Sequence, residues 1–113
     1  MAVTPEYRDF VLEQLGRVVP VTSRAMFGGV GIYSEGMIFG LMDDDTTYLK
    51  VNDGNRGGFE AAGMKPFDPY RDGVHVMQYY ELPAELLEDA DALRPWVAGA
   101  LDAARAARRK KKR

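Results

Sequence analysis

Residues 24–51, RAMFGGVGIYSEGMIFGLMDDDTTYLKV, are the stretch from which the fold of this chain can be worked out. The segment is rich in apolar, aromatic and β-branched residues, which suit the packed and pleated surface of a sheet. Two polar interruptions, residues 34–36 and 43–45, are typical of turns, and Gly36 can adopt the left-handed conformation that a three-residue hairpin needs. The pattern predicts three consecutive antiparallel strands joined by two tight turns.

The segments on either side of these strands have helical patterns. Thr4 and Pro5 are typical of an N-cap and a first helical position, and apolar residues follow at helical spacing up to Gly16. After the strands we expect a short helix at residues 56–62, a strand at 74–81 and a further short strand near 65–67. A helical turn at 83–88 precedes a long helix, whose apolar stripe covers residues 93–104.

This order of elements predicts an α+β fold. The expected architecture is a two-layer sandwich, in which helices cover one face of an antiparallel sheet of four to five strands. Leu49 and Val51 should point toward the helices, whereas periodicity does not settle which face of the other strands is buried. Because the central strand at residues 37–42 is apolar on both sides, the face without helices should keep an apolar surface, which a homodimer commonly covers.

Composition limits the classes of function. A chain of 113 residues is about one domain, and the absence of cysteine excludes disulfides, thiolate metal sites and a cysteine nucleophile. A single histidine, His75, cannot make a zinc site by itself, and three aspartates at residues 43–45 fit a turn better than a cation site. We therefore expect no catalytic residues, no metal and no cofactor. The sequence has neither a membrane span nor a signal-peptide pattern, which predicts a cytoplasmic protein.

Charge is distributed unevenly along the chain. The last six residues are all cations: Arg108, Arg109, Lys110, Lys111, Lys112 and Arg113. Subtracting these six charges from the net charge of −2 leaves −8 for residues 1–107. Adjacent like charges repel one another, so the pattern predicts a folded domain at 1–107 and a disordered basic tail at 108–113. Contact of this tail with nucleic-acid phosphates is one hypothesis, and simple solubilisation is the other.

Several short motifs carry a family resemblance. They are RxMFGGxGIY from Arg24, YLKV from Tyr48, FEAAG from Phe59, and YYE from Tyr79 with Pro83 after it. Over roughly residues 5–104, the chain resembles the N-terminal domain of the TfoX/Sxy family. The resemblance implies a small α+β domain and kinship with regulators of natural competence, which act with a cyclic-AMP-responsive activator. Full-length regulators carry a second, helical domain, so the resemblance implies a stand-alone version that lacks it.

Cations, glycines and aromatic residues of the strands are the candidate contact residues. Aromatic rings beside cations can stack a base or bind an anionic group of a protein, and the acidic body of this chain favours the protein. The glycines precede a continuing strand rather than a helix, so a bulge or a close backbone approach is favoured over a phosphate loop. The predicted partner- or ligand-binding residues are Arg24, Phe27, Gly28, Gly29, Phe39, Tyr48, Lys50, Tyr79 and Tyr80.

The sequence thus predicts a non-catalytic regulatory or adaptor domain with a link to transcription or competence regulation. It would act by protein–protein contact through the apolar sheet face, as a homodimer. The alternative is a small-molecule-binding module with a pocket between sheet and helices, near Phe27, Gly29 and Tyr79.

Overall fold

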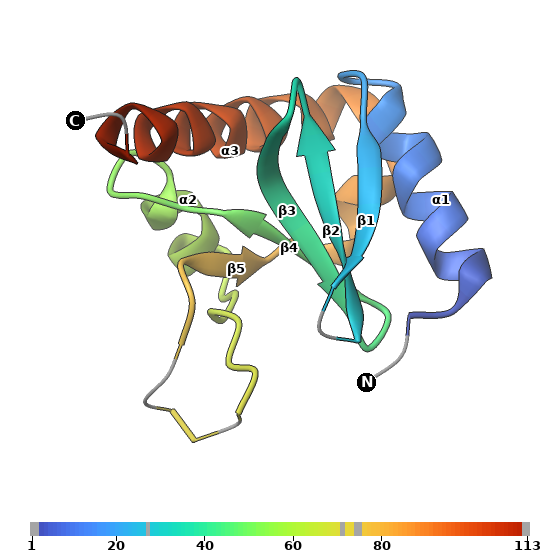
Figure 1. Cartoon of the computed structure of the whole chain (residues 1–113), viewed down its shortest axis with the longest axis horizontal. Coiled ribbons are helices and arrows are strands. Elements are labelled where there is room, and N and C mark those ends of the chain that lie inside the picture. The colour runs from blue at the N-terminus through green and yellow to red at the C-terminus, as the bar shows by residue number, and fades with distance from the viewer. Residues whose placement is uncertain (1–2, 27, 71, 74–75, 112–113) are drawn as a thin grey trace.

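The computed structural model describes residues 3–26, 28–70, 72–73 and 76–111. Residue Lys111 is described by its backbone alone. Its elements are α1 (Pro5–Gly16), β1 (Thr22–Met26), β2 (Gly29–Ser34), β3 (Met37–Asp43), β4 (Thr46–Lys50), α2 (Arg56–Ala61), β5 (Tyr79–Glu81), the 3-10 helix η1 (Ala84–Glu88) and α3 (Ala90–Lys111). The strands form one antiparallel sheet in the order β1-β2-β3-β4-β5 (Figure 1). The predicted α+β class is confirmed.

The helices begin and end where local chemistry favours it. Thr4 caps α1, because its side chain accepts a hydrogen bond from the amide of Tyr7. After α2, Gly63 adopts a φ of +78°, and the next amide, that of Met64, donates to the carbonyl of Phe59. Asp89 caps α3 by accepting hydrogen bonds from the amides of Asp91 and Ala92.

Two-residue turns connect β2 to β3 and β3 to β4. Glu35 and Gly36 have φ values of 53° and 76°, and Asp44 and Asp45 have values of 53° and 52°. Two consecutive positive values characterise the turn type that matches the natural twist of a hairpin. The left-handed conformation predicted for Gly36 is confirmed, but its loop has two residues, because Ser34 pairs directly with Met37.

The start of the predicted three-stranded segment contains one turn more than expected. The chain reverses at Gly28, where φ is +80°, so β1 and β2 are two strands and the segment up to residue 50 holds four. The pattern concealed this turn because no polar residue interrupts residues 25–33. Beyond α2, the strand predicted at 74–81 is present only as β5 (Tyr79–Glu81): residues 76–78 are not in a strand, and residues 74–75 lie outside the described part. The strand expected near 65–67 is a single bridge from Pro66 to Tyr80.

A single hydrophobic core lies between the sheet and the helices. Leu49 of β4 and Val51 just after this strand belong to the core, as predicted, together with residues of α3 such as Leu93 and Val97. A bulge in β3 opposite Ile32 and Tyr33 turns Phe39 into the same core, where it is fully buried. In Figure 1, α3 crosses behind the strands and α1 lies beside it. We call the sheet face toward this core the inner face, and the opposite one the outer face.

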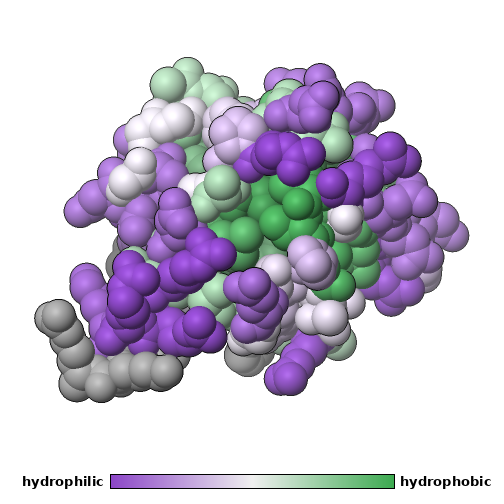
Figure 2. Space-filling model, turned by 90° about the horizontal axis from the view of Figure 1, so that it is seen from above, coloured by the Kyte–Doolittle hydropathy of each residue, from purple (hydrophilic) through white to green (hydrophobic). Residues whose placement is uncertain are grey.

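Helix α3 continues beyond the predicted end of the domain. Residues 108–111, which the charge pattern assigned to a disordered tail, extend the helix to Lys111, whereas residues 112–113 lie outside the described part. Alanine, arginine and lysine have high helix propensity, and cations are favourable at the carboxyl end of the helix dipole. Seen from above, the molecule shows an apolar area between polar side chains (Figure 2).

Candidate functional site

The outer face gathers side chains from all five strands. In β2 to β5, neighbouring positions belong to the core, such as Ile32 in β2, Leu49 in β4 and Leu82 just after β5, so the residues between them point the other way. The pairing of β1 with β2 places Arg24 on the same side as Gly31. The outer-face residues are Arg24, Met26, Gly31, Tyr33, Ile38, Leu41, Asp43, Tyr48, Lys50, Tyr79 and Glu81. The helices contribute to the core on the other face, and no described helix packs on this one.

Cations and aromatic rings are stacked on the outer face. The guanidinium carbon of Arg24 lies 5.4 Å from the ring centre of Tyr33, and Nζ of Lys50 lies 5.1 Å from that of Tyr79. Both distances are within the range of cation–π attraction. The rings of Tyr48 and Phe67 are 4.8 Å apart, so the segment before β5 adds a further aromatic side chain. These contacts hold long side chains flat against the sheet.

Two tyrosines of this face, Tyr48 and Tyr79, have raised pKa values. Burial raises the pKa of Tyr48, and the negative charges of Glu81, Asp43 and Asp44 raise it further. Burial also raises the pKa of Tyr79, with a smaller contribution from Tyr33. Neutral phenols are hydrogen-bond donors and apolar surfaces at once, which suits contact with another protein.

The predicted contact residues separate into two groups. Arg24, Tyr48, Lys50 and Tyr79 share the outer face, and Lys50 and Tyr79 are in contact. Phe39, in contrast, is fully buried in the core, and Tyr80 lies on the inner side. The bulge in β3 buries Phe39, so its assignment as a contact residue is corrected, whereas Tyr80 is partly buried and its assignment stays a prediction. Phe27 lies outside the described residues.

The glycines predicted as contact residues have structural roles. Gly28 forms the turn between β1 and β2, and a Cβ atom added at Gly29 would overlap the carbonyl oxygen of Met42. The expected close backbone approach is therefore present at Gly29. Sequence reasoning missed Tyr33, Ile38, Leu41 and Glu81 as outer-face residues. The direction of Leu49 and Val51 was predicted, so alternation along the chain could identify the outer-face residues of β4. Extending this to the neighbouring strands requires the strand register.

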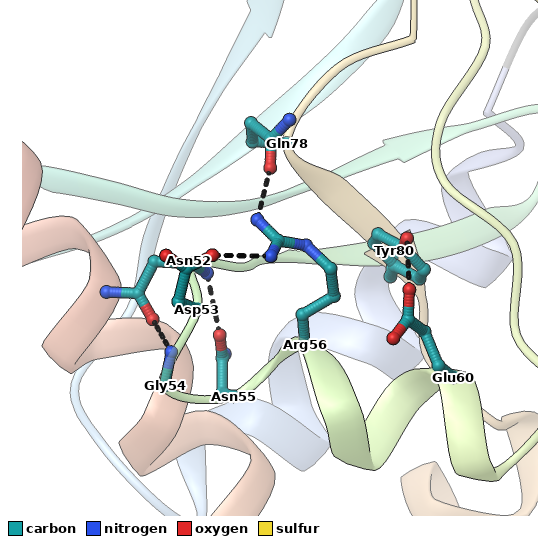
Figure 3. Close-up of polar contacts among 8 residues, drawn as sticks. All are labelled: Asn52, Asp53, Gly54, Asn55, Arg56, Glu60, Gln78 and Tyr80. Carbon is teal, nitrogen blue, oxygen red and sulfur yellow. Dashed lines mark hydrogen bonds and ion pairs between the residues drawn. The ribbon is translucent and has the colours of Figure 1, made fainter.

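A polar cluster beside α2 has its own hydrogen-bond partners (Figure 3). The guanidinium of Arg56 donates to Asp53 at 2.7 Å and to Gln78 at 2.8 Å. The pKa of Asp53 is lowered by the hydrogen bond and the charge of Arg56. The side chain of Asn55 accepts from the amide of Asn52 and donates to the carbonyl of Lys50. These groups are matched to one another, so the cluster connects β4 to α2 and to Gln78.

An open groove lies between α2 and α3, away from the outer face. Its lining comprises Gly54, Asn55, Gly58, Phe59, Pro95 and Trp96. The pocket predicted between sheet and helices would have used Tyr79, which instead faces outward. Within the described ranges, no group of three or more histidine, cysteine, aspartate or glutamate side chains is placed to hold a metal ion.

The structure describes some of the six cations that the sequence analysis assigned to a basic tail. Arg108, Arg109 and Lys110 are exposed near the end of α3, and Arg105 closer to the body forms an ion pair with Asp102 at 3.1 Å. Lys110 is near enough to Asp53 to contribute to its lowered pKa. Contact of residues 108–113 with nucleic acid stays a prediction.

Comparison with known proteins agrees with the fold and the strand motifs. Residues 13–104 match the family model described as TfoX N-terminal domain. The chain belongs to the TfoX N-terminal domain family. A search of curated proteins found no match for this TfoX N-terminal domain. Among the helices of its described part, none combines the length and the apolar character needed to cross a membrane.

Proposed function

We propose that this TfoX N-terminal domain is a non-catalytic regulatory domain that acts by protein–protein contact, with a link to transcription or competence regulation. Family membership supports the regulatory role. The outer face of the sheet is the contact surface. The observation that carries this proposal is the set of apolar and aromatic side chains on a face over which no described helix lies.

A second copy of the chain is the partner that this surface fits. The outer face carries cations, Arg24 and Lys50, and also acids, Asp43 and Glu81. A uniformly charged partner, such as a nucleic acid, would meet like charges over part of the face. A partner with the same mixture can match every charge, and closed two-fold dimers are the commonest protein assemblies.

The test is the sedimentation behaviour of the full chain at micromolar concentration. We expect a dimer for the unmodified protein and a monomer for Ile38→Asp, because this change puts a charge into the middle of the outer face. Phe10→Asp is the matched control, since Phe10 is an exposed apolar residue of α1, and this variant should remain dimeric. A folded Ile38→Asp variant that still sediments as a dimer, or a monomeric unmodified protein, would overturn the proposal.

A further inference from the structure

The two edges of the sheet, β1 and β5, differ in whether the chain itself covers them (Figure 1). At β5, the segment at residues 65–67 lies alongside the strand. The amide of Phe67 donates to the carbonyl of Tyr79 at 2.7 Å, and the amide of Glu81 donates to the carbonyl of Lys65 at 2.9 Å. Within the described residues, no segment pairs with β1 on the side away from β2. The edge at β1 is therefore open.

The strand register shows which backbone groups of β1 face this open edge. The two-residue turn after β2 makes the last residue of that strand, Ser34, exchange hydrogen bonds with β3. Successive residues direct their backbone groups to opposite sides of a strand, so those of Gly31 face β1, where Arg24 is the partner. Ser23 and Ala25, on either side of Arg24, therefore direct their N–H and C=O groups outward.

Strand β1 lacks the features that normally protect an edge. Natural edge strands carry proline, lysine or a bulge, or are covered by another segment. None of these is present in the described structure along Thr22–Met26. The guanidinium of its one charged residue, Arg24, lies over the ring of Tyr33 in the neighbouring strand. Ser23 and Ala25 are exposed as well, so the helix layer does not cover this strand.

The part of the chain that forms this edge is positively charged, although the folded body is acidic. Residues 14–34, which include β1 and β2, contain two cations, Arg17 and Arg24, and no acid. A carboxylate opposite Arg24 would make a cross-strand pair of opposite charge, which stabilises a sheet. On the other side of an added strand, Val21 and Ala25 favour apolar side chains.

We infer that the edge of β1 binds an extended segment of a partner protein in which apolar side chains alternate with acidic ones. The segment adds to the sheet antiparallel to β1 and exchanges two hydrogen bonds each with Ser23 and Ala25. Its acidic side chains lie on the same side as Arg24, and its apolar side chains lie beside Val21 and Ala25. This inference goes beyond the proposed dimer, because the edge and the centre of the outer face are different surfaces.

A second copy of the chain fits this edge less well. Residues opposite each other in paired strands share one face of the sheet. Within β1, Arg24 of one copy could therefore lie opposite Thr22, Arg24 or Met26 of the other. None of the three supplies an opposite charge, and one repeats the same charge. An acidic segment supplies the carboxylate that pairing between copies does not.

Hydrogen exchange of single amides tests the binding. The probe is a short synthetic peptide of three Val-Glu repeats, blocked at both ends. At saturation it should slow exchange of the Ser23 and Ala25 amides about tenfold or more, because these gain hydrogen bonds in the complex. The amides of Thr22 and Arg24, which already face β2, should change little. Uniform slowing along the chain, or none at Ser23 and Ala25, would overturn the inference.

Two substitutions at one position provide a matched comparison. Ala25→Pro removes an outward N–H without removing a hydrogen bond of the sheet, and should weaken peptide binding about tenfold. Ala25→Val keeps this N–H and should bind as the unmodified chain does. Circular dichroism establishes that both variants are folded. Equal affinities of the two variants would contradict the hydrogen-bonding role of the edge.

The charge of the probe and the variant Ile38→Asp separate the remaining outcomes. A peptide of Val-Lys repeats should bind about tenfold more weakly, and equal binding would contradict the acidic character of the partner. Ile38→Asp should bind the Val-Glu peptide with unchanged affinity, because Ile38 lies in β3, away from this edge. If the peptide does not bind and Ala25→Pro alone makes the protein monomeric, the edge joins copies of this chain and the inference is wrong.

Discussion

At the scale of single residues, glycines decide how closely neighbouring strands approach. Gly29 lies where an added Cβ atom would overlap backbone of β3, whereas Gly58 in α2 has nothing within 4 Å of such an atom. A side chain would therefore clash at Gly29 but not at Gly58. The sequence suggested a close approach near the first of them, but only the structure identifies Met42 as the residue approached.

Alanine substitution separates these two positions. Gly29→Ala should lower the free energy of unfolding by about 2 kcal/mol, because backbone atoms must move to admit the methyl group. Gly58→Ala should raise it by up to about 1 kcal/mol, since alanine favours a helix that has room for it. Urea denaturation measures both. Equal effects of the two substitutions would contradict the role of Gly29.

Tyr7 makes stability depend on alkaline pH. Its hydroxyl shares a 2.7 Å hydrogen bond with the buried Thr47. Burial raises the pKa of Tyr7 above its usual value near 10, although the hydrogen bond to Thr47 opposes the shift. Below about pH 10 the phenol is protonated in both the folded and the unfolded chain. At higher pH the unfolded chain ionises first, so stability falls as pH rises through the folded-state pKa.

The variant Tyr7→Phe tests this account. It leaves the hydroxyl of Thr47 without this partner, so the free energy of unfolding at pH 7 should fall by about 1 kcal/mol. The further loss of stability between about pH 9 and pH 11 should be smaller than in the unmodified chain, because the variant lacks one tyrosine whose pKa is raised in the folded state. It should not vanish, since the pKa values of Tyr48 and Tyr79 are raised too. An unchanged pH profile would refute the assignment.

At the scale of elements, local signals located the helices better than the strands. The Thr4 cap, the glycine after α2 and the apolar stripe of α3 are short-range features, and each is present. The turn at Gly28 carries no polar residue, so apolar periodicity alone could not reveal it. Residues 108–111 were assigned to a tail because charge repulsion was weighed above helix propensity.

The candidate site was predicted only in part for a related reason. The direction of a strand side chain follows from alternation, but a single extra residue reverses it. The bulge in β3 does this, so Phe39 belongs to the core although it was predicted to be a contact residue. Arg24, Tyr48, Lys50 and Tyr79 share the outer face because their strands pair regularly, and their role as contact residues stays a prediction.

The start of α3 gives a prediction at this scale. Asp89 accepts hydrogen bonds from two amides of the first turn, at 3.1 Å and 3.2 Å. Asp89→Ala should therefore cost about 1 kcal/mol of stability, while Asp89→Asn, which keeps an accepting oxygen, should cost only a few tenths. Thermal unfolding followed by circular dichroism distinguishes the two. Equal losses would mean that the oxygen atom does not cap the helix.

At the scale of the whole molecule, the helices and the sheet form two layers, and the sheet is left with one uncovered side. The dimer that we propose would cover it with a second sheet that carries the same cations and acids. Charges at the rim of such an interface are partly exposed, so salt should screen them. The dissociation constant of the unmodified dimer should rise with ionic strength, whereas that of a purely apolar interface would not. Sedimentation equilibrium at low and high salt measures the difference.

Cysteine is absent from the chain, so a single introduced cysteine can be spin-labelled without ambiguity. Ile38→Cys places a label on the outer face of β3, and Ala98→Cys places one on the exposed side of α3. Electron paramagnetic resonance of the two labelled proteins is the most direct test. The account predicts strong dipolar coupling between copies at position 38 and weak coupling at position 98. The reverse order, or coupling at neither position, would contradict it.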